Sequence, residues 1–435
     1  MNIVLFTNTY LPHVGGVARS VAAFCKEYRR LGHQVLIIAP EFPNMLKNEL
    51  GVIRLPAIQN FNGSDFSALL PVFQNLHSAL NQFKPDIIHS QHPFLIGMTA
   101  IRVARFRNLP IVFTHHTLYE QYTHYVPGDS PTLKRFVVEL STHYANLTEH
   151  VFAPSESIKS LIQSRGVTKP ISVIPTGVTS EHFAVGNGKQ FRRKHNIAQD
   201  NFVVGHMGRL AEEKNLVFLA KAVVKFLKNA PKSCFVVVGA GEYETHIKKI
   251  FEQAGLLHAV FFTGVLLRNE LVDALYAMDL FAFTSKSETQ GMVLTEAMAA
   301  SVPVVALDAN GVREVVFDKI NGRLLYKNSI KEFAEALQEI NNLSKEKMQR
   351  LKQNARNTAE KFSIHVSAKK SIACYQKILS QPHVTHNYDD ESLNQVLALI
   401  KAEWDIIKSF IDSGIVALSD DGSQQKFVKG AKHDR

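Results

Sequence analysis

The sequence lacks any long hydrophobic run. No apolar stretch approaches the ~20 residues that a membrane-spanning helix needs. The first residues also lack a basic segment followed by an apolar core, so we expect no secretory signal peptide. Cysteine is scarce, and its odd count of 3 argues against a disulfide framework. These absences favour a protein with reduced thiols that works in the cytoplasm.

Local concentrations of positive charge are also missing. The chain has 435 residues and a formal charge of +10, but no Lys/Arg block resembles a nucleic-acid-binding arm. We therefore expect no nucleic-acid partner, and nothing indicates an obligate protein partner. A basic balance of this kind suits phosphorylated small molecules or an anionic lipid surface.

The pattern that is present is a repeated alternation of short apolar strands and amphipathic helices. Such alternation predicts an α/β fold with doubly wound parallel sheets covered on both faces. The length suits two domains. The predicted strands are Ile3–Asn8, Gln34–Pro40, Asp86–Gln91, Ile111–His116, His150–Ser155, Ile171–Gly177, then Phe202–Gly208, Phe235–Gly239, Val260–Gly264, Leu280–Ser285 and Val302–Leu307.

A polar, glycine-containing stretch separates the two series of strands. We therefore predict a Rossmann-like N-terminal domain over 1–180 and a Rossmann-like second domain over 190–362. A helix over 363–380 is expected to return to the first domain, and 381–435 to form a helical extension with a polar tail. Two such domains would face a cleft lined by the carboxyl ends of their strands.

The most informative segment is FTSKSETQGMVLTEAMAASVPVVA, Phe283–Ala306. A strand ends before a loop that carries Glu288, Gly291 permits a tight turn, and a helix then begins near Met292. Free amides at such a helix start bind phosphate, and Glu296, one turn later, suits a ribose diol. Taken alone, two acids at this spacing are common and more often mark a solvated loop residue and a surface helix residue.

This segment resembles the nucleotide-sugar signature of the retaining glycosyltransferases of family 4, which have the two-domain GT-B fold. The resemblance covers both acids, Thr289-Gln290-Gly291 and Pro303-Val304-Val305. It implies that Glu288 contacts the donor sugar and Glu296 the ribose. It also implies that the backbone of Gln290, Gly291, Met292 and Val293 approaches the sugar and phosphates, with Thr289 beside them.

A second segment, GHMGRLAEEKN, places Arg209 and Lys214 five residues apart after a strand. Two fixed cations can neutralise a departing diphosphate. On composition alone, a solvated helix face explains them as well. The family resemblance assigns both residues to the donor pyrophosphate.

Two further segments lie in the first half. Gly15 and Gly16 form a turn after the first strand, where backbone can approach a ligand closely. The run Thr114–Tyr125 resembles a stretch of diacylglycerol glucosyltransferases within the family. That resemblance places His116 at the donor sugar's outer hydroxyls and puts Tyr119, Glu120 and Tyr122 in the acceptor region.

We therefore expect a metal-independent, retaining hexosyltransferase that needs no cofactor and uses a nucleotide-diphosphate sugar, by resemblance UDP-glucose. The expected acceptor is a lipid such as diacylglycerol, met at the cytoplasmic face of an anionic membrane by a peripheral enzyme. Alternatives are the same chemistry on a soluble or polysaccharide acceptor and a catalytically lapsed nucleotide-sugar-binding scaffold. An oxidoreductase is disfavoured because GxGxxG is absent.

Overall fold

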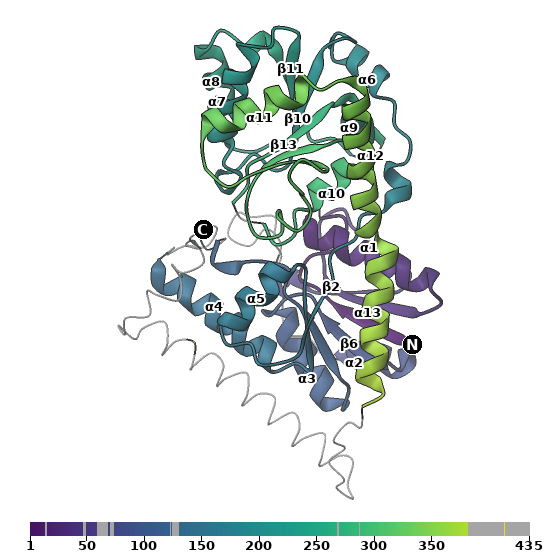
Figure 1. The fold of residues 1–435 in the computed structure, drawn as a ribbon. Coiled ribbons are helices and arrows are strands. Elements are labelled where there is room, and N and C mark those ends of the chain that lie inside the picture. The colour runs from purple at the N-terminus through teal and green to yellow at the C-terminus, as the bar shows by residue number, and fades with distance from the viewer. Residues whose placement is uncertain are drawn as a thin grey trace, which may run out of the picture. The chain divides into compact units, whose positions relative to one another are not determined.

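The computed structural model describes residues 1–13, 15–46, 49–58, 68–69, 74–121, 123, 130–267, 269–286, 288–381 and 413. It divides into two compact units (Figure 1). The first holds Met1–Pro175 and the described residues from Ser367 onward, and the second holds Thr176–Val366. Of the helical extension and polar tail predicted over 381–435, the structure describes only residues 381 and 413.

The first unit is built on a parallel sheet of seven strands in the order β3-β2-β1-β6-β7-β8-β9. Its strands are β1 Asn2–Phe6, β2 Gln34–Pro40, β3 Val52–Leu55, β6 Ile87–Ser90, β7 Ile111–Thr114, β8 His150–Ala153 and β9 Ile171–Val173, and a small antiparallel pair joins β4 Ala57–Ile58 to β5 Ala68–Leu69. Strand order reverses between β1 and β6, which is where doubly wound sheets bind ligands.

Helices cover both faces of this sheet because its strands are apolar on both sides. They are α1 Gly16–Arg30, α2 Gln74–Phe83, α3 Ile96–Phe106, α4 Pro131–Asn146 and α5 Glu156–Ser164, with the short helix η2 Tyr119–Gln121. The last described helix, α13 Ile364–Leu379, packs beside α1. There the hydroxyl of Tyr375 bonds to Nδ1 of His89 at 2.6 Å, and Tyr28 bonds to Ser371 at 2.7 Å.

The second unit has a parallel sheet of six strands in the order β12-β11-β10-β13-β14-β15. Its strands are β10 Phe202–Met207, β11 Ser233–Val238, β12 Val260–Gly264, β13 Leu280–Phe283, β14 Val304–Leu307 and β15 Gly322–Leu325. Its helices are α6 Gly188–Lys194, α7 Leu216–Leu227, α8 Glu244–Gln253, α9 Asn269–Ala277, α10 Met292–Ala299, α11 Ile330–Asn341 and α12 Lys345–Lys361, with the short helices η4 Ser180–Phe183, η5 Glu212–Lys214 and η6 Leu257–Ala259. Two apolar cores lie on opposite faces.

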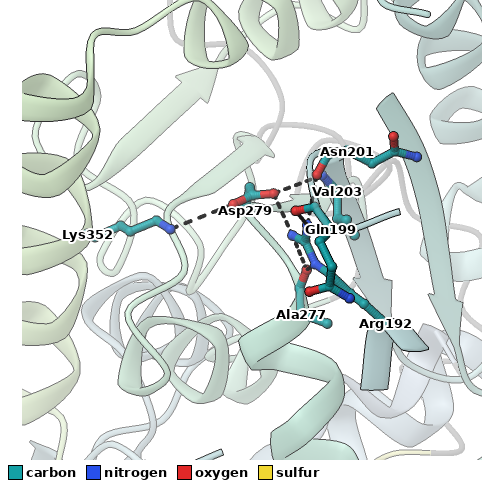
Figure 2. Close-up of polar contacts among 7 residues, drawn as sticks. All are labelled: Arg192, Gln199, Asn201, Val203, Ala277, Asp279 and Lys352. Atoms are coloured by element: carbon teal, nitrogen blue, oxygen red, sulfur yellow. Dashed lines mark hydrogen bonds and ion pairs between the residues drawn. The ribbon is translucent and has the colours of Figure 1, made fainter. Parts of the chain in front are cut away.

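Arg192 of α6 ties the start of this unit to the amino edge of the sheet (Figure 2). Its guanidinium donates to Oδ2 of Asp279 at 2.8 Å and to the carbonyl oxygen of Ala277 at 2.7 Å. The same carboxylate oxygen accepts the Val203 amide at 3.0 Å, and Lys352 lies 3.8 Å from Oδ1. With the side chain of Arg192 only 11% exposed, α6 is fixed to the sheet.

The second unit begins at Thr176, before the domain boundary between residues 180 and 190 that the sequence predicts. The amide of Val178 donates to the Phe362 carbonyl at 2.8 Å, and Phe183 is buried in the core that holds Phe191. These contacts place Thr176 and the residues after it in the second unit. The unit also continues to Val366, past the predicted end at 362, because the amide of Ile364 donates back to Val178 at 2.9 Å.

The predicted doubly wound α/β architecture is present in both units, with two edge strands that the sequence did not indicate. These are β3 and β15, which carry Arg54 and Arg323 and so interrupt the apolar pattern. In the part of the chain that the structure describes, no helix is both long and apolar enough to cross a membrane.

Candidate functional site

An ion pair between Lys214 and Glu288 joins the two charged segments of the second unit. The Nζ atom of Lys214 lies 2.7 Å from Oε1 of Glu288, and the side chains are only 17% and 15% exposed. Lys214 ends the loop after β10, whereas Glu288 lies in the loop after β13. Because β10 and β13 are neighbours in the parallel sheet, their carboxyl ends bring the cation and the carboxylate together.

Hydroxyl groups of the β13 loop hold the Lys214 segment in place. Oγ1 of Thr284 donates to the carbonyl oxygens of Lys214 and Asn215, at 3.1 and 3.3 Å. Oγ of Ser285 donates to the carbonyl oxygen of Glu213 at 3.4 Å. Both hydroxyl residues are fully buried, and their hydrogen bonds fix the backbone that carries Lys214. Sequence analysis missed them, although two polar residues directly after an apolar strand were a usable signal.

Arg209 lies in the same loop and is more accessible. Its guanidinium donates to Oε1 of Glu213 at 2.6 Å, and 48% of its side chain is exposed, against 8% for Glu213. Both predicted cations therefore contact carboxylates: Arg209 pairs with Glu213 in its own loop, and Lys214 pairs with Glu288 in the loop after β13. A diphosphate bound by Arg209 and Lys214 would share or compete with these contacts.

The start of α10 has the geometry that the sequence predicts for an anion site. Gly291 precedes the helix with φ 72° and ψ 55°, a left-handed conformation that favours glycine. Thr289, Met292 and Val293 are half-buried around the helix start, and Glu296 is buried one turn into the helix. The free amides of a first helical turn attract anions. Donor binding by these residues and by Glu296 stays a prediction.

The side chain of Gln290 is directed into the protein. Its amide bonds to both the N–H and the carbonyl oxygen of Thr176, and only 3% of the residue is exposed. Any contact of Gln290 with a donor would therefore involve its backbone.

In the first unit, the Gly15–Gly16 turn opens α1. Gly15 is the residue before the helix, with an extended backbone, and Gly16 is its first residue. Apart from its chain neighbours and the backbone of α1, a Cβ atom built on Gly16 would meet no atom within 4 Å. Internal packing therefore does not require glycine there, and the open space leaves room for a ligand.

His116 follows β7 and is held in one tautomer. Its Nε2 donates to Oε1 of Gln91 at 2.7 Å, which leaves Nδ1 as the acceptor atom. Burial lowers the pKa of His116 to about 4, so the ring is neutral at physiological pH. A neutral ring suits contact with a sugar hydroxyl, the role that the family resemblance implies.

Three further histidines accompany His116, two of which sequence analysis passed over. Burial lowers the pKa of His89, His92 and His115 to about 3. His89 contacts Thr114 at 2.6 Å through Nε2, and His92 accepts the Asn8 amide at 3.1 Å. Histidines at the end of an apolar strand, as in IIHSQH, were the signal available.

Among the described residues, no three His, Cys, Asp or Glu side chains gather closely enough to hold a metal ion. Of the residues expected in the acceptor region, Tyr122 lies outside the described residues, whereas Glu120 forms an ion pair with Arg165 at 2.6 Å.

Known proteins share both the sequence pattern and the fold. The family model described as Glycosyltransferase Family 4 matches residues 14–182, and the model described as Glycosyl transferases group 1 matches 187–358. The α-monoglucosyldiacylglycerol synthase of Streptococcus pneumoniae is 31% identical over 332 residues, which are 75% of each chain. A GDP-mannose-dependent α-mannosyltransferase of Mycobacterium tuberculosis is 29% identical over 336 residues, 75% of this chain and 84% of the relative.

Among solved structures, the Anabaena protein HepE in complex with UDP and glucose superposes with a TM-score of 0.68 at 22% identity, covering 88% of this chain and all of HepE. Sucrose-phosphate synthase from Thermosynechococcus elongatus gives 0.71 at 19%, covering 87% of this chain and 99% of the synthase. These likenesses concern the fold. Together with the 31% identical relative and the two family models, they show that the chain belongs to the family 4 glycosyltransferases of GT-B fold.

Proposed function

We propose that this glycosyltransferase moves a glucosyl unit from UDP-glucose to a lipid acceptor of the diacylglycerol type, with retention of configuration. The observation that carries the proposal is the Lys214–Glu288 pair, with Arg209 nearby in the same loop and the start of α10 following in the next. A diphosphate needs cations and free amides, and a reacting sugar needs a nearby carboxylate. The glucosyldiacylglycerol relatives supply the choice of sugar and acceptor.

The proposed chemistry needs no proton transfer to a protein side chain. The bond between the sugar C1 and the diphosphate oxygen breaks while C1 develops positive charge. The acceptor oxygen bonds to C1 on the same face, and its proton passes to an oxygen of the departing phosphate. Lys214 and Arg209 stabilise the charge that grows on the diphosphate, and Glu288 stabilises the charge at the sugar. In this scheme a metal ion is not needed.

The acceptor would be met at the cytoplasmic surface of an anionic membrane. Each basic residue on or next to α1 and α3 would contribute about 1 kcal/mol near such a surface. In the structure Arg30 pairs with Glu27, Arg105 pairs with Glu149 and Arg107 bonds to Asn81. Binding to lipid therefore has to compete with these internal contacts.

A release assay tests the donor. We expect the purified chain to release nucleotide slowly from UDP-glucose without acceptor and at least about tenfold faster with diacylglycerol in phosphatidylglycerol vesicles. GDP-mannose is the decisive comparison, because mannosyltransferases are also among the relatives. Faster turnover of GDP-mannose would overturn the sugar assignment, and stimulation by soluble acceptors alone would overturn the lipid assignment. If no sugar nucleotide is turned over or bound, the transferase assignment itself is wrong for this chain.

Vesicle co-sedimentation tests the membrane step separately. We expect binding to increase with phosphatidylglycerol content and to weaken between low and physiological salt, because screening shortens the reach of charge. Binding that ignores both variables would contradict an electrostatic attachment.

Gly16→Ala tests the glycine turn. The new methyl group enters open space, so the free energy of unfolding should stay within about 1 kcal/mol of the wild type. Glucosyl transfer should fall about tenfold or more, because the methyl group occupies the place of an approaching ligand. Gly97→Ala is the contrasting variant: its Cβ would lie 2.0 Å from the His92 carbonyl oxygen, so stability should fall. Normal transfer by Gly16→Ala would remove the turn from the site.

A further inference from the structure

Gln290 lies in the middle of the loop that carries the predicted donor residues. Glu288 stands two residues before it and Met292, the first residue of α10, two residues after it. Its side chain is nevertheless directed into the protein. Oε1 accepts the N–H of Thr176, and Nε2 donates to the carbonyl oxygen of the same residue.

The side-chain amide of Gln290 thus pairs with the Thr176 peptide as a neighbouring strand would, and it joins segments far apart in the sequence. Gln290 is 3% exposed and Thr176 is 6% exposed, so water cannot replace either bond. Thr176 is the first residue of the second unit, directly after Pro175, the last residue of the first unit before the chain crosses. Gln290 thus binds the backbone, through two hydrogen bonds, at the point where the chain enters the second unit.

A different segment closes the loop from another side. Gly311 has φ 73°, and a Cβ atom there would lie 2.6 Å from both the Cα and the N of Gln290. Such close backbone contact requires glycine. Next to Thr176, Gly177 packs against Ile364, with an ideal Cβ only 2.2 Å from its Cα. The loop is therefore held between the Gly311 turn and the paired segments around residues 176–178 and 362–364.

We propose that Gln290 is a positioning residue for glycosyl transfer: by binding the Thr176 peptide, its side chain sets the place of Glu288 and of the first turn of α10. The inference rests on the proposed function for the role of Glu288, but the contact itself does not. It also implies that a change in the backbone at Thr176, where the chain enters the second unit, would shift the loop that carries Glu288. A residue that binds the donor through its side chain would behave differently in the tests below.

The first test needs no substrate. In Gln290→Ala the Thr176 amide loses its acceptor, so hydrogen exchange in the peptide covering residues 174–178 should become at least about tenfold faster. Gln253→Ala, at an exposed position at the end of α8, is the matched control and should leave that peptide unchanged. Unchanged exchange in Gln290→Ala would overturn the proposed contact.

The second test uses turnover and pH. Gln290→Ala should lower kcat about 10- to 100-fold with a smaller change in the donor KM, because misplacement acts on the reacting geometry. Gln290→Glu has the same shape, and its protonated carboxyl group can both accept from N–H and donate to the carbonyl oxygen of Thr176. Its activity relative to the wild type should therefore rise by up to tenfold per pH unit as the pH falls from 8 to 5.5, because burial favours the protonated acid.

The activity of Gln290→Ala relative to the wild type should stay constant over the same pH range. The activity of Gln253→Glu should equal that of the wild type at every pH. A flat ratio for Gln290→Glu would overturn the positioning role. A Gln290→Ala variant with raised KM, normal kcat and normal exchange would make Gln290 a donor ligand instead. If Gln290→Ala fails to fold, exchange in Gln290→Glu at pH 5.5 and 8 decides the same question. If the wild type turns over no sugar nucleotide, the proposed function fails while the exchange test still decides the contact.

Discussion

Replacing Glu288 by glutamine should lower kcat by about 100- to 1,000-fold and leave the fold intact. The amide keeps the shape of the side chain and an oxygen for Lys214, which lies 2.7 Å away, but it removes the negative charge. A carboxylate that opposes positive charge at the sugar acts mainly in the transition state, so kcat should fall far more than the donor KM changes.

Glu212→Gln is the control, because Glu212 is exposed and lies two residues from Lys214. It should retain turnover within about twofold. Steady-state release of nucleotide from UDP-glucose, with circular dichroism to confirm folding, measures both variants. Turnover by Glu288→Gln within about threefold of the wild type would remove Glu288 from the reacting site.

The paired geometry adds a sharper expectation. Because Lys214 and Glu288 contact each other, the effects of Lys214→Gln and Glu288→Gln should not add. Once one partner is neutral, the other is left without its counter-charge, so the double variant should lose less than the product of the two single losses. Strict additivity would mean that the two side chains act independently.

The second large effect expected is on stability in mild acid. His89 and His115 are buried, His92 and His116 are half-buried, and desolvation lowers the pKa of each from 6.5 to about 3 or 4. All four stay neutral in the folded chain, whereas the unfolded chain takes up protons below about pH 6.5. The unfolded state then binds more protons, so stability falls with falling pH. Their contribution is complete above pH 6.5 and is lost as the pH falls toward 4.

Each histidine should add roughly 1.4 kcal/mol per pH unit to this slope once the unfolded chain is protonated. His115→Phe tests one of them, because its ring packs against Phe113 and Tyr119, both at 5.8 Å, and its Nδ1 has no hydrogen-bond partner in the described chain. In the variant, the free energy of unfolding should change less steeply with pH, by about the contribution of one histidine.

Hydrogen exchange in peptides of β6 and β7 between pH 7.5 and 5, corrected for intrinsic rates, measures the slope in this unit. His246→Phe, at an exposed position on α8, should leave the slope unchanged. Equal slopes in the wild type and His115→Phe would mean that His115 is protonated in the folded chain.

The sequence placed Lys214 and Glu288 after two strands of one domain, and the structure brings them together for a physical reason. Apolar runs marked β10 and β13, and charged residues followed each run. The carboxyl ends of neighbouring parallel strands lie at the same edge of a sheet. Lys214 and Glu288 must therefore lie close together if β10 and β13 are neighbours. The sequence did not reveal that the two strands pair directly, and the contact distance therefore came only with the structure.

Other parts of the site were hidden because they depend on distant partners. The Thr176 peptide is 114 residues from Gln290, and no local pattern connects them. The edge strands β3 and β15 were missed because arginines interrupt their apolar runs. His89 and His92 lie within or just after a strand, where apolar periodicity conceals a buried polar side chain whose partners come from other elements.

The path of α13 also has a consequence for how the protein is made. Residues of α13, including Tyr375 and Ile372, complete one of the cores of the first unit, and the second unit is encoded entirely before them. On the ribosome, the first sheet must therefore wait, with one face partly uncovered, until the whole second unit has been synthesised. A chain that stops at Pro175 would expose Tyr28 and leave His89 without Tyr375. Expression of the N-terminal half alone is thus expected to give aggregated protein, whereas residues 176–366 have both their cores within one continuous stretch.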